Sequence, residues 1–205
     1  MNHNKSDSQS LASKLQLRRQ ILAALSEPLR VLDLYSGAGE IWKALGKEFP
    51  IAAYTPVDVK PRLPGCIPLN VDARSVGAFD LARFNVIDLD SYGDCWEVWD
   101  TLSRRIQTRT AVFVTYGFQG KGSNWSLSYF LKTASGIPKS WHIPTNEKLL
   151  RFLGERFVVN SLTQFSTEKA LYFQRPASGF GSAHHTPTDY YGFLISRPGA
   201  RSQEA

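Results

Sequence analysis

The sequence lacks the features that mark secreted, membrane and zinc-binding proteins. It contains only two cysteines, Cys66 and Cys95, and they form no Cys-x-x-Cys pair. Free thiols are therefore expected, with neither a zinc site nor a disulfide framework. No apolar run approaches the roughly 18 residues that a membrane span requires, and the polar first residues lack the apolar core of a signal peptide. We expect a soluble cytoplasmic protein with no membrane partner.

Two common phosphate-binding signatures are also missing at the most prominent glycine-rich turn. The apolar run 31–34 ends abruptly, and Gly37 and Gly39 follow it closely. Two glycines there permit a left-handed turn and a close approach of the backbone to a ligand. A dinucleotide fingerprint would need a third glycine where Trp42 stands, and no Gly-Lys-Ser/Thr follows as in a Walker loop. A different nucleoside-containing cofactor is favoured, although an ordinary glycine-turned strand of another α/β enzyme stays open.

Strand-like and helical segments alternate along the 205 residues, which predicts one doubly wound α/β domain over 10–197. A polar tail over 1–9 is expected to be disordered, and a second polar tail follows at 198–205. An aromatic and glycine-rich insertion over 118–144 interrupts the pattern. Helices are expected over 10–27, 40–49, from about 95 to 106 and over 145–156, and strands over 31–35, 51–59, 67–71, 85–90, 110–116, 157–165, 169–174 and 190–196.

Acidic residues follow several of the predicted strands. Asp58 ends the second strand, and its two carboxylate oxygens suit the vicinal hydroxyls of a ribose; the alternative is a solvated Asp in a proline-rich loop. Asp72 follows the third strand, where Asp also favours turns for local reasons. Asp88 and Asp90 lie on one face of the fourth strand because side chains alternate along it. Such a pair is costly to bury unless donors or a ligand face it, which indicates a site.

The turn after the first strand resembles motif I of the class I S-adenosylmethionine-dependent methyltransferases, in which an acidic strand residue precedes Gly-x-Gly. Asp33, Tyr35, Gly37 and Gly39 stand at these positions. The resemblance implies a Rossmann-like, seven-stranded, mostly parallel sheet with helices on both faces and an antiparallel last strand. It also implies S-adenosylmethionine as the cofactor. Asp58 would then bind the ribose, and Asp72 and Ala73 would contact the adenine.

The segment 87–93, Ile-Asp-Leu-Asp-Ser-Tyr-Gly, resembles motif IV of the tRNA guanine N2-dimethyltransferases. That resemblance implies that Asp90 accepts an N–H of an exocyclic amine and later takes its proton, and that Tyr92 stacks on the base. Asp88 is a further catalytic candidate. Ser91 departs from the family pattern, which has proline here, and a serine backbone is freer than a proline.

The charge and the insertion point to the partner. Lys and Arg outnumber Asp and Glu by 24 to 18, a net charge of +6, which favours a polyanionic partner through counterion release or merely improves solubility. Residues 118–144 interleave lysines with aromatic rings, which would stack unpaired bases or cover the sheet edge. His184 and His185 lack a third ligand at metal spacing, so no metal is predicted.

These features predict methyl transfer from S-adenosylmethionine to an exocyclic amino nitrogen of a nucleic acid base, with RNA favoured over DNA. Two alternatives stay open. One is a non-catalytic methyltransferase-like module that binds nucleic acid or a partner subunit, which the serine in motif IV motivates. The other is a methyltransferase that acts on a small molecule or a protein.

Overall fold

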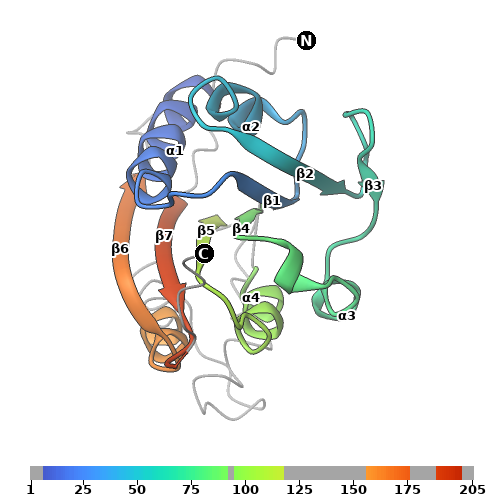
Figure 1. The fold of residues 1–205 in the computed structure, drawn as a ribbon. Helices are drawn as coiled ribbons and strands as arrows, with labels where there is room; N and C mark the ends of the chain where they lie inside the picture. Colours follow the sequence, from blue (N-terminus) through green and yellow to red (C-terminus); the bar gives the residue numbers. More distant parts are fainter. Residues whose placement is uncertain (1–6, 92–94, 118–155, 176–187, 200–205) are drawn as a thin grey trace, which may run out of the picture.

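The computed structural model describes residues 7–91, 95–117, 156–175 and 188–199. Seven strands form one sheet in the order β3-β2-β1-β4-β5-β7-β6 (Figure 1). β7 runs antiparallel to both of its neighbours, and the other pairs are parallel. This arrangement confirms the predicted sheet and its antiparallel last strand. The strands are β1 (Leu29–Leu34), β2 (Ile51–Asp58), β3 (Ile67–Pro68), β4 (Val86–Asp90), β5 (Thr110–Gly117), β6 (Ser166–Arg175) and β7 (Thr188–Ser196).

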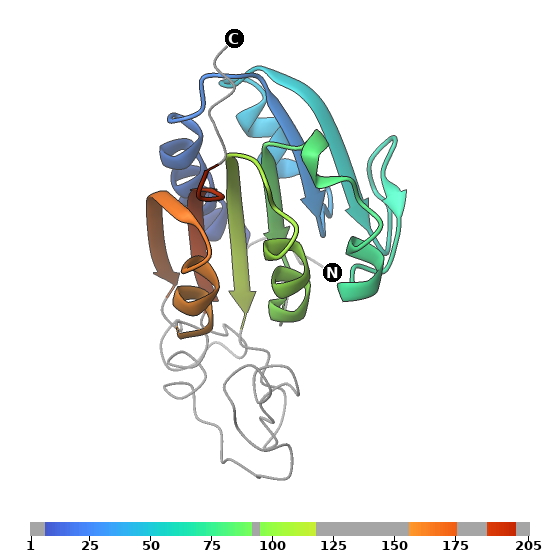
Figure 2. The same cartoon turned by 60° about the horizontal axis from the view of Figure 1, so that its bottom comes forward.

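Helices cover both faces of the sheet, because alternate strand residues are apolar on each side (Figure 2). Val31 packs on one face with α1 and α2, and Leu32 packs on the other with α4. Gly192 of β7 lets α1 approach closely, since a Cβ there would lie 3.1 Å from Ile21 Cγ1. The helices are α1 (Asp7–Leu22), α2 (Glu40–Leu45), α3 (Ala73–Val76), the 3-10 turn η1 (Leu81–Arg83), α4 (Trp96–Ser103) and an unlabelled helical segment over 156–162.

The segment 156–162 corrects one sequence prediction, because a strand was expected over 157–165. The backbone over 156–162 is helical, with Val158 buried and Val159 59% exposed. Its Ser161 hydroxyl accepts a hydrogen bond from the Trp99 indole at 2.8 Å. The adjacent β-branched valines favour a strand locally, but packing against α4 overrides that preference.

The boundaries of other elements also differ from the prediction. α1 begins at Asp7, inside the stretch expected to be a disordered tail, and β3 ends at Pro68 instead of residue 71. The predictions for Tyr92, the insertion 118–144, the helix 145–156 (apart from residue 156) and His184 lie outside the described residues. None of the helices in the described ranges is long and apolar enough to cross a membrane.

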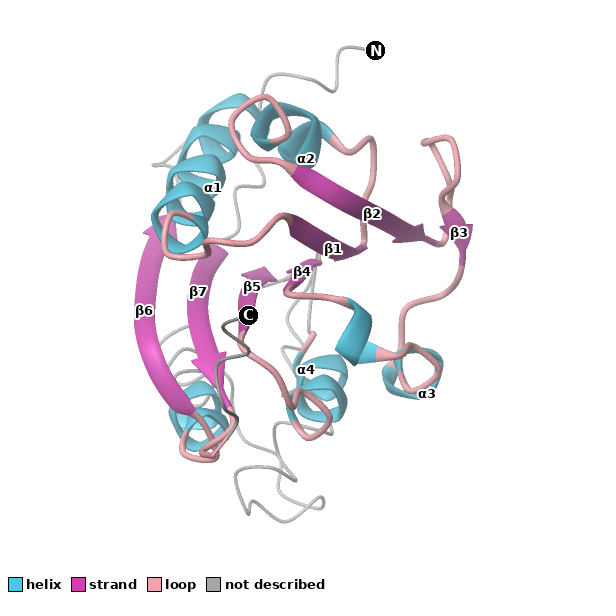
Figure 3. Ribbon diagram, in the orientation of Figure 1, coloured by secondary structure: helices cyan, strands magenta, loops and turns pink. Residues whose placement is uncertain are grey.

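The connection from β2 to β3, residues 59–66, contains no helix (Figure 3). Parallel neighbours are usually joined by a crossover helix that covers one face of the sheet. Here Ala52 and Ala53 of β2 are correspondingly exposed. A cavity lies beside α2 on this part of the sheet and is described below.

Candidate functional site

The turn after β1 is held in a strained conformation against the end of β2. Gly37 and Gly39 have φ angles of 54° and 69°, and Tyr35 has a φ of 70° although it is not glycine. The N–H groups of Tyr35 and Ser36 both donate to the carbonyl of Val57, at 2.9 and 3.0 Å. Left-handed backbone costs a non-glycine residue about 1 to 2 kcal/mol. Such strain clusters at ligand-binding sites, which makes the turn a site candidate.

Asp58 completes this turn from the end of β2. Its Oδ2 accepts the N–H of Gly37 at 2.9 Å, and its Oδ1 accepts the N–H of Lys60 at 2.8 Å. Each carboxylate oxygen keeps a second lone pair, so the group is oriented and still able to accept hydroxyl donors. A Cβ on Gly37 would meet nothing within 4 Å, so there is open space beside the turn.

Asp72 and Ala73 lie at the start of α3. The Asp72 side chain accepts the Ser75 N–H at 2.7 Å, and the Ser75 hydroxyl accepts the Asp72 N–H at 2.9 Å. This reciprocal capping box lowers the pKa of Asp72. The structure thus gives Asp72 a local capping function, and contact of these two residues with an adenine stays a prediction.

Asp88 is fully buried on the face of β4 that α1 and α2 cover. Arg18 of α1 donates Nη2–H to Oδ1 at 2.6 Å and Nε–H to Oδ2 at 2.8 Å. The Trp42 indole donates to Oδ2 at 3.0 Å. Complete burial raises the pKa of Asp88, and the Arg18 guanidinium limits that rise. Protein donors surround Asp88 and its side chain is buried, so the contacts seen here are structural ones, and its catalytic role stays a prediction.

Asp90 ends the same strand and is 16% exposed. Both of its oxygens lie 2.7 Å from the ammonium of Lys14, which donates a hydrogen bond to Oδ2. Burial opposes ionisation of Asp90, but Lys14 and Arg18 together lower its pKa below the ordinary value. We call the Lys14–Asp90 and Arg18–Asp88 pairs the charge ladder.

Asp33 lies beside Asp88 in the register of β1 and β4. It is 3% exposed, and the hydroxyl of Tyr54 donates to it at 2.7 Å. Burial and the neighbouring Asp88 raise the pKa of Asp33 well above its ordinary value. The predicted cofactor contact of Asp33 is untested, and in the structure this carboxyl group faces protein atoms.

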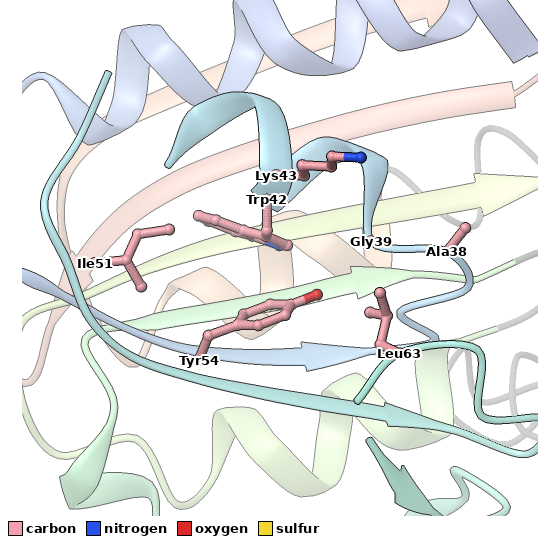
Figure 4. Close-up of a pocket in the computed structure, with 7 residues that line it drawn as sticks. All are labelled: Ala38, Gly39, Trp42, Lys43, Ile51, Tyr54 and Leu63. Atoms are coloured by element: carbon pink, nitrogen blue, oxygen red, sulfur yellow. The ribbon is translucent and has the colours of Figure 1, made fainter. Parts of the chain in front are cut away.

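A cavity of about 230 Å³ lies between α2, β2 and the 59–66 connection (Figure 4). Its wall is largely apolar, with the Lys43 amine and the Tyr54 hydroxyl as polar groups. Among the predicted site residues Gly39 lines it, so the cavity does not coincide with the predicted cofactor contacts. The residues around it are Ala38, Gly39, Trp42, Lys43, Ile51, Tyr54 and Leu63.

The described part of the chain therefore brings the glycine turn, Asp58 and Asp90 to the carboxyl ends of neighbouring strands, where ligands bind in open α/β sheets. Lys14 and Arg18 are functional candidates that the sequence did not single out. Within the described ranges no three His, Cys, Asp or Glu residues gather as a metal site would require.

No protein-family model matches the chain, and no curated protein matches it. Among solved structures, phosphoethanolamine N-methyltransferase 2 of Haemonchus contortus with bound S-adenosyl-L-methionine aligns with a TM-score of 0.51 and 10% identity. That alignment covers 91% of this chain and 53% of the other, so the chain spans about half of that protein. A putative hemolysin from Lactococcus lactis aligns with a TM-score of 0.52 and 13% identity, over 88% of this chain and 85% of the other. With its strand order and these neighbours, the chain has the Rossmann-like fold of the class I methyltransferases.

Proposed function

We propose that the protein transfers a methyl group from S-adenosylmethionine to an exocyclic amino nitrogen of a nucleic acid base, with RNA the favoured substrate. The observation that carries this proposal is the placement of two chemically distinct groups at one sheet edge. The strained glycine turn is hydrogen-bonded to Asp58, and Asp90 ends β4, which lies beside β1. The first group suits a nucleoside cofactor, and the second suits an amine.

The cofactor side would be formed by backbone and carboxylate. Gly37 and Gly39 would present the turn to the ligand, Asp58 would accept the ribose hydroxyls, and Asp72 with Ala73 would lie at the adenine. When bound, S-adenosylmethionine supplies a methyl group that its sulfonium has already activated. This chain then needs only to hold the acceptor nitrogen in line, which is a proximity effect.

Asp90 would act on the acceptor. Lys14 and Arg18 keep its carboxylate ionised, so an oxygen accepts an amine N–H and directs the nitrogen lone pair. A lowered pKa makes Asp90 a weak base, but methylation gives the amine nitrogen a positive charge, and the N–H of that cation is strongly acidic. The proton is therefore released readily after transfer. Tyr92 is the candidate for stacking on the base.

RNA is favoured by the net charge of +6, and a small-molecule or protein substrate would show little dependence on salt. A second candidate function is a non-catalytic module that binds nucleic acid or a partner. The 2.7 Å contact between Lys14 and Asp90 favours it, because the carboxylate already has a protein partner.

The first test is calorimetric titration of S-adenosylmethionine into the full chain and into Asp58→Ala. Hydrogen bonds to charged groups contribute about 1.5 to 3 kcal/mol, so we expect affinity to fall at least about tenfold. Asp80→Ala is the matched control, because Asp80 only caps η1 by accepting the Ala82 N–H and should leave binding unchanged. Equal binding by wild type and Asp58→Ala would refute the predicted cofactor site.

The second test separates the two candidate functions. Labelled methyl transfer to total RNA is measured for wild type and Asp90→Asn, with ribonuclease-treated RNA as the control. An enzyme loses transfer in Asp90→Asn and keeps cofactor binding, whereas the non-catalytic module transfers nothing in either form. Transfer that survives ribonuclease would assign a protein or small-molecule substrate instead.

A further inference from the structure

The two cations of the charge ladder match the two acids of β4 by simple geometry. Lys14 and Arg18 are four residues apart, so they lie on one face of α1. Asp88 and Asp90 are two residues apart, so they lie on one face of β4. The pairs meet at 2.7 Å for Lys14 with Asp90 and at 2.6 Å for Arg18 with Asp88. The helix is thus docked on the strand at two points along its length.

The inner pair, Arg18–Asp88, positions the outer pair, Lys14–Asp90. The Arg18 and Asp88 side chains are each 1% exposed. Arg18 also donates Nη1–H to the carbonyl of Lys14 at 3.2 Å, which ties the backbone that carries the lysine. The Lys14 ammonium lies 5.6 Å from the ring centroid of Tyr190 in β7. The ammonium therefore contacts Asp90 of β4 and lies near Tyr190 of β7.

In the outer pair, Lys14–Asp90, the carboxylate can accept a further hydrogen bond. The hydrogen bond from Lys14 goes to Oδ2 of Asp90. Oδ1 is buried and lies 2.7 Å from the same ammonium, and the Thr115 hydroxyl also donates to this carboxylate. A carboxylate has about four lone-pair sites, so the partly exposed Asp90 group can accept a further N–H when the site is filled.

We propose that Lys14 is a positioning residue of the acceptor site: it fixes the Asp90 carboxylate in one orientation, as an anion, so that this carboxylate receives the N–H of the acceptor amine. This proposal rests on the proposed methyl transfer for its catalytic meaning, but the fixed, charged carboxylate is a property of the free protein. The titratable groups that act on Asp90 from the elements around it are Lys14 and Arg18 of α1, Asp33 of β1 and Asp88 of β4, and Tyr190 of β7 acts on Lys14.

The test is carbon-13 NMR of the Asp side-chain carboxyl carbons in the full chain, titrated by pH without cofactor or substrate. The Asp90 signal is identified by its loss in Asp90→Asn. In Lys14→Met, which keeps an unbranched apolar stem, we expect the Asp90 midpoint to rise by about 1 to 3 pH units. Lys14→Arg should restore the wild-type midpoint. Lys43→Met is the control, because Lys43 is exposed on α2 and should leave Asp90 unchanged.

An Asp90 midpoint that is the same in Lys14→Met and wild type would overturn the proposal. Circular dichroism checks that each variant is folded, and Lys14→Gln replaces Lys14→Met if the latter is not. Because the titration needs no turnover, its outcome is independent of whether S-adenosylmethionine binds. If transfer is measured, Lys14→Met should lower kcat and shift its pH profile, with cofactor affinity unchanged.

Discussion

Replacing Arg18 by methionine should destabilise the protein far more than replacing Arg19 by methionine. In Arg18→Met, Asp88 keeps its burial and the single indole donor of Trp42, but loses the guanidinium that donates at 2.6 and 2.8 Å. Removing one partner of a buried ion pair costs about 3 to 5 kcal/mol, because the other charge stays buried without compensation. For a chain of this size, that corresponds to a fall in Tm of roughly 6 to 20 °C.

Arg19 provides the matched control. It belongs to the same helix and makes a similar two-point contact with Glu48, but both side chains are at least 40% exposed. Solvent screens such pairs, so Arg19→Met should change stability little. Urea unfolding followed by tryptophan fluorescence compares the two variants. Adding Asp88→Asn to Arg18→Met should recover part of the loss. Equal midpoints for Arg18→Met and Arg19→Met would refute the energetic role of the charge ladder.

Three further predictions concern the described core. Asp33→Asn should leave stability unchanged near pH 4 and raise it increasingly toward pH 8. Because the pKa of Asp33 is raised in the folded protein, the folded state holds a proton that the unfolded chain releases, and wild-type stability falls as pH rises. Urea unfolding at both pH values measures this difference. Gly192→Ala should cost about 1 to 3 kcal/mol in urea unfolding, because the added Cβ would lie 3.1 Å from Ile21 Cγ1. Ser161→Ala should lower the free energy of unfolding by about 1 to 3 kcal/mol, because it removes the acceptor of the buried Trp99 indole. It also removes this hydrogen bond between the 156–162 helix and α4. Thermal unfolding measures the loss of stability, and hydrogen exchange detects the weaker attachment of the helix.

The sheet was predictable from the sequence because its signals are local. An apolar run followed by two glycines identified β1 and its turn, and Asp58 at the end of β2 was found from its distance along the chain. The helix over 156–162 was not predictable in this way. Val158 and Val159 favour a strand by themselves, and only contact with α4 decides otherwise.

The sequence contains a pattern that indicates the charge ladder, but it involves residues far apart in the chain. Leu11, Leu15, Leu22 and Leu25 recur at helical spacing, and Arg18 occupies the vacant position of that stripe. A cation on the apolar face of a helix must find an anion when the helix is buried. The two acids of β4 supply anions on one face of their strand. Periodicity alone could not pair the helix with that strand, because they are seventy residues apart and the contact depends on the sheet order.

The charge balance of the cluster explains why Asp33 differs from the other two acids. Asp88 and Asp90 each pair with a cation, whereas among the described residues the hydrogen-bond partner of the Asp33 side chain is the hydroxyl of Tyr54. A third carboxylate ion beside Asp88 would add an uncompensated negative charge to a buried site, so the protonated form is favoured. Asp33 therefore holds its proton to a higher pH than an ordinary aspartic acid does. When Asp33 is protonated, Lys14 and Arg18 are left to the acids of β4, and this helps to keep Asp90 charged at the edge where the acceptor is proposed to bind.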